Sequence, residues 1–237
     1  MMLHTARLTL RPWEERDAEQ LYKLASDPEV GPDCGWNPHK SLEESRELLP
    51  KLLMNVYTWA IVLKETDEVI GDISLMPFGT SSKARNEREK EIGFWLGRAY
   101  WGNGYMPEAC KELLRHAFED LGAECVWCAH HDKNHKSARV QEKCGFRFDH
   151  SNEHFARQLG ITLTSIVNCL TKEQWEQVQM RQDVFDDSIP GGWDMQWIPN
   201  PQIKGVTNYF YSETAPTKEG NYWHYVDGIP TPWKTEE

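Results

Sequence analysis

The stretch from Glu91 to Ala109 constrains the fold more than any other part of this 237-residue chain. It reads as a strand at 91–96, a loop at 97–105 that holds three glycines, and a helix that begins near Pro107. Proline suits the first turn of a helix because the N–H it lacks would have no partner there. The segment therefore predicts a strand, a glycine loop and a helix in direct succession.

Such a loop exposes consecutive backbone N–H groups at a helix N-terminus, which is a site for anions. Gly102 and Gly104 would let the backbone approach a phosphate group with no Cβ in the way. Loops that bind dinucleotides or mononucleotides use the same physics. Their GxGxxG spacing and their terminal Lys-Ser/Thr pair are both absent here, so the loop is typical of neither class.

Alternating and helical patterns along the chain predict a mixture of strands and helices. We expect strands at 5–11, 58–64, 69–76, 91–96, 124–129 and 161–170, with a further strand starting at 145–148. We expect helices at 18–25, from 41 onward, at 107–121, 134–144 and 171–178. Pro50 lies inside the second helix and should kink it or end it early.

The composition changes after about Gln182, where prolines and aromatic residues dominate and helical periodicity is absent. Disordered segments are poor in aromatic residues, so we expect 178–237 to be an ordered extension of a domain at 1–177. Segments 208–211 and 221–226 are candidate strands around a turn at 216–220. The extension could cap a sheet edge, form a homodimer contact or close a substrate cleft, and packing or dimerisation is favoured.

The charge balance argues against several classes of function. The formal net charge of -11 comes without an evident basic face, which argues against a nucleic-acid partner and is compatible with a cationic amine. Uncharged stretches such as 159–170 are too short to span a bilayer. Residues 1–11 lack the apolar core of a secretory signal. We therefore expect a cytoplasmic protein without a membrane partner.

The six cysteines share no repeating spacing, so we expect no disulfide framework. Cys125 and Cys128 have CxxC spacing, but residues three apart on a strand point to opposite faces. Buried free thiols are therefore expected instead of a redox pair. His130, His131 and His135 lie nearby without completing a ligand set, so we expect no metal.

Three blocks of the sequence resemble one known family. They are Thr5-Ala-Arg-Leu-Thr-Leu-Arg-Pro-Trp with Asp17-Ala18, Glu91-Ile-Gly-Phe-Trp-Leu through Trp101-Gly-Asn-Gly-Tyr-Met, and Asn134-His-Lys-Ser-Ala-Arg-Val-Gln-Glu-Lys-Cys-Gly-Phe. Together they resemble the GNAT acyltransferases, specifically the RimJ/RimL-like branch of ribosomal-protein alanine N-acetyltransferases, over 3–177. The resemblance implies an α/β fold with a mixed central sheet flanked by helices. It also implies acetyl transfer from the cosubstrate acetyl-CoA to an amine.

The resemblance further implies which residues bind the donor. The strand residues Trp95, Leu96 and Arg98 would offer backbone groups to the pantetheine arm. From the needs of the reaction, we expect the backbone N–H near Leu96 to polarise the thioester oxygen. The pyrophosphate would be held by the N–H groups of Gly102, Asn103, Gly104, Tyr105 and Met106. Asn134 would contact the coenzyme, and Ser137 would point at the thiol.

Two positions depart from the family pattern. Many members carry Gly or Ala where this chain has Met106, and Tyr where it has Gln141. That Tyr protonates the leaving thiolate. In its absence Ser137 is the replacement candidate, because a hydrogen bond to negative charge developing on sulfur already lowers the barrier.

Direct attack by an amine needs a base, because an alkylamine is mostly protonated at neutral pH. Glu91, on the central strand, is the first candidate, and the alternative is that its carboxylate pairs with a basic residue. Glu89, Asp72 and His131 are weaker candidates.

The resemblance places the acceptor cleft beside the loop at 31–39. Trp36 and His39 are candidate lining residues, with a core plug and a surface residue as the alternatives. The acceptor would be a primary amine of a small molecule or of a protein N-terminus. The rival hypotheses are a non-catalytic acyl-CoA-binding sensor and an interaction protein that acts through the extension.

Overall fold

The computed structural model describes residues 1–186, 195–198, 209–212, 222–226 and 229–233, with side chains described for 1–179. By its internal contacts the chain divides into two compact units, Met1–Gln179 and Met180–Glu237. The first unit carries all the predicted site residues.

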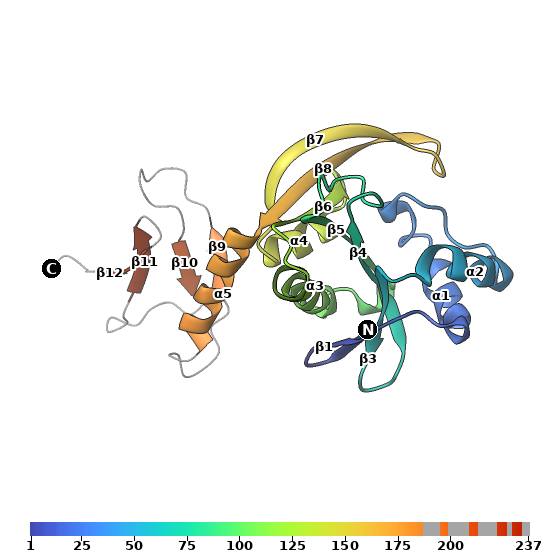
Figure 1. The fold of residues 1–237 in the computed structure, drawn as a ribbon, viewed down its shortest axis with the longest axis horizontal. Helices are drawn as coiled ribbons and strands as arrows, with labels where there is room; N and C mark the ends of the chain where they lie inside the picture. The colour runs from blue at the N-terminus through green and yellow to red at the C-terminus, as the bar shows by residue number, and fades with distance from the viewer. Residues whose placement is uncertain (187–194, 199–208, 213–221, 227–228, 234–237) are drawn as a thin grey trace. The chain divides into compact units, whose positions relative to one another are not determined.

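An eight-stranded sheet forms the frame of the first unit, in the order β1-β2-β3-β4-β5-β6-β8-β7 (Figure 1). Its strands are β1 (Leu3–His4), β2 (Leu8–Arg11), β3 (Thr58–Leu63), β4 (Val69–Pro77), β5 (Glu89–Leu96), β6 (Cys125–His131), β7 (Arg147–Ala156) and β8 (Ile161–Thr171). Only β5 and β6 run parallel within this sheet; its other pairs are antiparallel. The helix between β5 and β6 provides the long crossover that a parallel pair needs. The predicted mixed sheet is confirmed.

Helices cover both faces of the sheet (Figure 1). α1 (Ala18–Ala25) and α2 (Leu42–Leu48) lie on one face, and α3 (Tyr105–Arg115) and α4 (His135–Lys143) lie on the other. Ser41 caps α2, since its Oγ accepts a hydrogen bond from the Glu44 N–H at 3.1 Å. The early end predicted from Pro50 is confirmed, because α2 stops at Leu48 and gives way to a π-helical turn at Leu49–Leu53.

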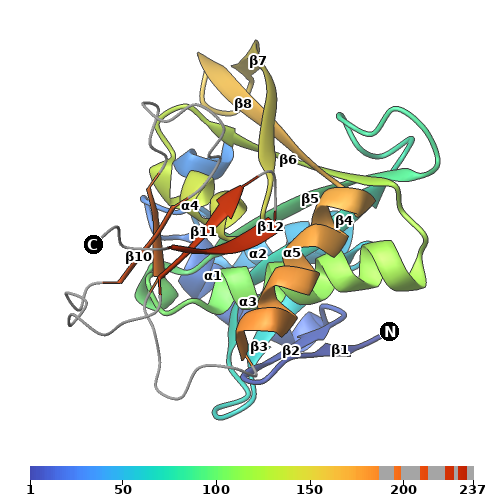
Figure 2. The ribbon, with the colours of Figure 1, turned by 90° about the vertical axis from the view of Figure 1, so that its left-hand side faces the viewer.

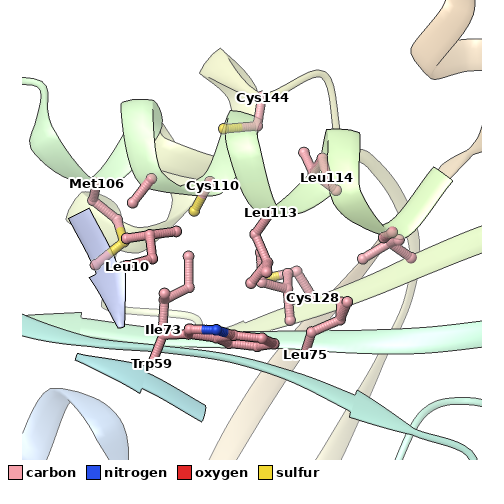
Figure 3. Packing of buried hydrophobic residues seen from close by; sticks show 14 of the residues in the cluster. Leu10, Trp59, Ile73, Leu75, Met106, Cys110, Leu113, Leu114, Cys128 and Cys144 are labelled. Atoms are coloured by element: carbon pink, nitrogen blue, oxygen red, sulfur yellow. The ribbon is translucent and has the colours of Figure 1, made fainter. Parts of the chain in front are cut away.

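The main hydrophobic core lies between α3 and the sheet (Figure 3). The inner stripe of α3 contributes Met106, Cys110, Leu113 and Leu114, and the sheet contributes Leu10, Trp59, Ile73 and Leu75. A second cluster, which includes Leu21, Ala60 and Val69, joins α1 to the other face. Full burial of one such aliphatic side chain contributes about 1.5–3 kcal/mol, so the two clusters fix the sheet between its helices.

β7 and β8 form a long hairpin that extends from the rest of the sheet (Figure 2). Of β7 the sequence predicted only the start at 145–148, whereas β8 was expected at 161–170. Residues 147–155 are exposed, so they carry no apolar alternation that would have indicated a strand. The hairpin turn meets the loop between α1 and α2, where Asn37 Nδ2 donates a hydrogen bond to the Gln158 carbonyl at 2.7 Å.

Within the second unit, β9 (Met195–Ile198) pairs with β10 (Tyr209–Ser212), and β11 (Tyr222–Val226) pairs with β12 (Ile229–Trp233). Strands were expected at 208–211 and 221–226, and both are present. The two strands pair with different partners and not with each other. β12 was missed because two of its five residues are prolines, which argue against a strand. The turn at 216–220 lies outside the described residues. α5 (Lys172–Asp186) begins in the first unit.

All six cysteines are free, and Cys128 is buried while Cys125 is half-buried. Among the described residues no helix combines the length and apolar character needed to cross a membrane. The same part of the chain holds no group of three or more His, Cys, Asp or Glu side chains suited to a metal ion.

Candidate active site

β5 and β6 pair only at their first residues and then diverge. Their parallel ladder ends where Glu91 faces Trp127, although β5 continues to Leu96 and β6 to His131. On the edge of β5 that faces β6, the last five residues of β5 have no sheet partner in the part of the chain described. Unpaired strand edges accept an extended ligand as an added strand. The sequence thus forms a parallel pair that opens at the end nearest the glycine loop.

A cavity of about 780 Å³ opens at this divergence. Its walls come from β4, β5, β6, β8, α4 and the loop between α1 and α2. Trp101, from the glycine loop, and Met106, from the first turn of α3, reach its rim. The Trp101 indole donates a hydrogen bond to the Leu96 carbonyl at 2.9 Å, which ties the glycine loop to the end of β5.

The glycine loop has the backbone that the sequence predicted. Gly102 and Gly104 have φ of 80° and 77°, in the left-handed region where a Cβ is disfavoured. Gly104 is the N-cap of α3. Within the described chain, no backbone N–H from Gly102 to Met106 donates a hydrogen bond. These N–H groups and the positive end of the helix dipole fit a pyrophosphate.

Arg7, from the turn before β2, holds this loop in place. Its NH1 donates to the Asn103 carbonyl at 3.0 Å, and its guanidinium lies 4.5 Å from the centre of the Tyr105 ring. Glu108 in turn accepts from Arg7 Nε at 2.6 Å and from the Arg7 backbone N–H at 2.8 Å. Burial alone would raise the pKa of Glu108, but hydrogen bonds from Thr5 and Arg7 outweigh it and lower the pKa. The loop is therefore fixed before any ligand arrives.

α4 presents its first turn to the cavity. Asn134 caps the helix, since its Oδ1 accepts from the Ser137 N–H at 2.9 Å, and both residues line the cavity. Ser137 Oγ accepts a hydrogen bond from Gln141 Nε2 at 3.2 Å. Because the Ser137 oxygen accepts in this contact, the hydroxyl hydrogen of Ser137 is not used by it and can be donated elsewhere.

Gln141 is the centre of a buried polar network. It is fully buried, and its Oε1 accepts from Asn168 Nδ2 at 2.6 Å and lies 3.3 Å from His130 Nδ1. Burial lowers the pKa of His130, which favours the neutral ring. The network fixes the Gln141 amide, and the amide fixes the Ser137 oxygen.

Two carboxylates lie on the cavity floor, which is one face of the β4–β5 ladder. Asp72 faces Trp95 across this ladder, and Glu91 faces Met76. Glu91 Oε2 accepts from Ser81 Oγ at 2.7 Å and from the Ser82 N–H at 2.9 Å. The alternative that Glu91 pairs with a basic residue is not found among the described residues.

Asp72 lies in a different environment from Glu91. It is 5% exposed, and the Trp13 indole donates to its Oδ1 at 2.7 Å. Burial raises the pKa of Asp72 to about 7, although the hydrogen bond from Trp13 opposes the rise.

The loop between α1 and α2 forms the wall opposite α4. Trp36 lies in this wall and packs edge-on against Trp95, with ring centres 5.9 Å apart. The Asp33 carbonyl accepts from Asn134 Nδ2 at 3.1 Å, and the Asp33 carboxylate pairs with Lys136 at 3.3 Å. The loop thus contacts α4 directly across the mouth of the cavity.

The structure brings seven of the predicted site residues to the cavity: Trp36, Glu91, Trp95, Leu96, Met106, Asn134 and Ser137. His39 does not line it; the ring packs behind Trp36 and lies 2.8 Å from Ser45 Oγ. Arg98 points away and pairs with Glu29 at 2.6 Å. Trp101 from the glycine loop lines the cavity, and the Gly102–Tyr105 part of the loop lies beside it. The roles assigned to these residues stay predictions.

Sequence reasoning missed two features of the site. Gln141 was noted only as the position of an absent Tyr, although a polar residue on the inner side of a helix could have indicated a buried network. Asp72 was considered a weak base candidate. Its signal was a lone charge in the otherwise uncharged run of 69–77.

Comparison with known proteins gives the same fold and family. The Acetyltransferase (GNAT) domain family matches residues 7–147. The solved GNAT-family acetyltransferase from Bacillus anthracis has 22% sequence identity and a TM-score of 0.65, and the match covers 73% of this chain and 99% of that one. At this identity the likeness supports the fold alone.

Two curated relatives extend the comparison. An uncharacterized N-acetyltransferase, p20 of Bacillus licheniformis, is 28% identical over 178 residues, covering 73% of this chain and 97% of its own length. The FsC-acetyl coenzyme A-N(2)-transacetylase of Aspergillus fumigatus is 26% identical over 225 residues, covering 88% of this chain and 92% of its own length. Residues 1–179 are only about three quarters of the chain, so this second match extends into the second unit. With a family match over more than half of its residues, the chain belongs to the GNAT family of acetyltransferases.

Proposed function

We propose that this acetyltransferase moves the acetyl group of acetyl-CoA to a primary amine, by direct attack of the amine on the thioester. The observation that carries the proposal is the opening between β5 and β6, which lies beside a glycine loop whose N–H groups have no partner among the described residues. The free edge of β5 suits the pantetheine arm, and the loop suits the pyrophosphate. GNAT acetyltransferases use acetyl-CoA, and the name of the Aspergillus relative also specifies acetyl coenzyme A.

In this proposal the protein positions the reactants and stabilises charge. The Leu96 backbone N–H polarises the thioester oxygen. Ser137 donates its free hydrogen to the sulfur as the C–S bond breaks, and Gln141 holds the Ser137 oxygen in place. Positioning supplies much of the rate in such a transfer, because it converts a bimolecular step into a unimolecular one.

The acceptor is a primary amine of a small molecule or of a protein N-terminus. The name of the Aspergillus relative indicates transfer to a nitrogen numbered N(2), which supports a nitrogen acceptor. The acidic net charge of -11 suits a cationic acceptor, which it would attract over a distance.

The test is release of the coenzyme A thiol by the full chain with acetyl-CoA and a panel of primary amines. Ser137→Ala should lower kcat about 100- to 1,000-fold, the effect of losing one hydrogen bond to developing charge. Ser151→Ala removes an exposed hydroxyl on β7 and serves as the matched control. Thiol release from no amine would leave the acyl-CoA sensor as the better reading. Equal kcat for Ser137→Ala and Ser151→Ala would remove Ser137 from the mechanism.

A further inference from the structure

Asp72 is a buried carboxylate with one unused oxygen in the cavity. Its Oδ1 accepts the Trp13 indole hydrogen, but Oδ2 has no hydrogen-bond partner and the side chain no ion pair among the described residues. Asp72 lines the cavity. Its unpaired Oδ2 is not fully enclosed by protein atoms, so a ligand in the cavity can reach it. A buried carboxylate is costly unless a cation or several donors compensate it. The unused oxygen therefore marks the place for a cationic group that is not part of the chain.

A structural role with Trp13 does not explain this side chain. An asparagine would accept the same hydrogen bond from the indole through its own Oδ1 and would carry no charge into the interior. Retaining the acid costs stability, and this is common where a group performs chemistry. Burial has also brought its pKa close to neutral pH, where a group can both take up and release a proton.

The other carboxylate on the floor, Glu91, is already satisfied. Three donors from Ser81 and Ser82 reach its Oε2, at 2.7, 2.9 and 3.4 Å. By its register with Met76, it lies four residues along β4 from Asp72, or roughly 13 Å at 3.3 Å per residue. Asp72 faces Trp95, one residue from the Leu96 N–H expected to polarise the thioester. Of the two carboxylates, Asp72 lies nearer to the expected reaction centre.

Aromatic rings complete the corner around Asp72. Trp95 lies directly opposite it on the ladder, and Trp36 packs against Trp95. Ring faces beside a carboxylate are suited to an alkylammonium group, because they attract its charge and cover its apolar stem. Loss of solvation, followed by the nearby Asp33 and Asp72 carboxylates, raises the pKa of the Cys34 thiol to about 12, so this thiol stays uncharged and adds no second anion to the corner.

The remaining charged and titratable groups around the cavity do not neutralise Asp72. Asp33 is paired with Lys136, whose ammonium also lies over the Trp101 ring at 3.8 Å. Lys83 Nζ donates to Ser82 Oγ at the Glu91 end. Burial lowers the pKa of His131, which favours the neutral ring.

We propose that the acceptor is a primary alkylamine whose ammonium group docks on Asp72 Oδ2 beside the packed Trp36 and Trp95 rings, and that Asp72 takes its first proton. The proposal rests on the proposed acetyl transfer and assigns the base to Asp72 instead of Glu91. The ammonium N–H bond breaks and the proton moves to Oδ2, which leaves a neutral amine. Its nitrogen bonds to the thioester carbon, and the C–S bond breaks. The second nitrogen proton goes to the sulfur through Ser137, and Asp72 returns its proton to water.

The test measures kcat/KM against pH for n-hexylamine, with the full chain as wild type, Asp72→Asn and Glu91→Gln. The wild type should gain activity as the pH rises through about 7, as Asp72 ionises. Asp72→Asn should lose this rise and about 100-fold in kcat/KM, with its affinity for acetyl-CoA unchanged. Glu91→Gln should keep the rise. Trp13→Phe removes the hydrogen bond that lowers the Asp72 pKa, so the rise should move to higher pH.

The outcomes separate this inference from the proposed function. If the wild type acetylates n-hexylamine and Asp72→Asn keeps both its rate and its pH profile, the inference is wrong and the acetyl transfer stands. The same holds if Glu91→Gln is the variant that loses the rise. If the wild type acetylates no amine, the proposed function fails, and the inference fails with it. Unchanged affinity for acetyl-CoA in Asp72→Asn shows that the variant is folded.

Discussion

Asp72→Asn should make the protein more stable at neutral and alkaline pH. The pKa of Asp72 rises from 3.8 to about 7 on folding, chiefly through burial. At 1.36 kcal/mol per pKa unit, keeping this carboxylate ionised in the folded protein costs on the order of 4 kcal/mol. The change to Asn removes the charge and keeps an acceptor for the Trp13 indole.

The sign of the pH dependence follows from linkage. The unfolded chain releases the Asp72 proton near 3.8, whereas the folded chain holds it until about 7. Stability therefore falls as the pH rises through this window, and the whole penalty is present above it. The variant should gain roughly 2–3 kcal/mol more over the wild type at pH 8 than at pH 5.

Urea unfolding of the wild type and Asp72→Asn at pH 5, 6, 7 and 8 measures this difference. The free energies are compared from the unfolding midpoints, with one common dependence on urea concentration for both proteins. Trp13→Phe is the companion variant. The free energy of unfolding should keep falling to a higher pH for this variant than for the wild type, because the hydrogen bond it removes lowers the Asp72 pKa. A gain for Asp72→Asn that is the same at every pH, or no gain at pH 8, would refute the reasoning that Asp72 is buried without a partner.

Two further variants test the supports of the site. Gln141→Leu should lower the free energy of unfolding by about 1–3 kcal/mol, because the buried Asn168 amide loses its acceptor. Urea unfolding measures this loss, and adding Asn168→Leu should recover part of it. A Gln141→Leu variant as stable as the wild type would contradict the buried network. The pKa of Glu108 is lower in the folded protein than its usual value of 4.5, so the ionised carboxylate stabilises the fold above that pH and loses this effect as the pH falls through the folded-state pKa. Glu108→Gln should therefore lose less stability than the wild type below about pH 4.5. Identical acid unfolding curves for Glu108→Gln and the wild type would show that Arg7 and Thr5 do not stabilise the carboxylate.

The sequence predicted the part of the fold whose signals are local. The glycine loop before Pro107 predicted the start of α3, and two apolar runs joined by a short polar turn predicted the hairpin of β3 and β4. It missed most of β7, because an exposed strand has no apolar face to reveal it. It also missed β12, because prolines at two of five positions argue against a strand that nonetheless pairs with β11.

The site residues divide in the same way, into those that a local sequence signal predicts and those that it does not. Asn134 and Ser137 share one turn of α4, so a short motif was enough to predict both. Long-range partners carry no such signal. Nothing in the sequence relates Trp13 to Asp72, which is 59 residues away, or Asn168 to Gln141, which is 27 residues away. These contacts decide which carboxylate is free and which way the Ser137 hydrogen points, and they depend on the folded sheet.

The most direct test of the account is calorimetric titration of the full chain with acetyl-CoA. Gly102→Asp would place a carboxylate among the N–H groups expected to hold the pyrophosphate. Gly122→Asp is the matched control beyond the other end of α3, because both glycines have positive φ, 80° and 64°, and neither has an atom within 4 Å of an added Cβ. We predict that the wild type and Gly122→Asp bind acetyl-CoA equally, and that Gly102→Asp binds at least about 10-fold more weakly through charge repulsion. No binding by the wild type, or equal binding by both variants, would contradict the donor site.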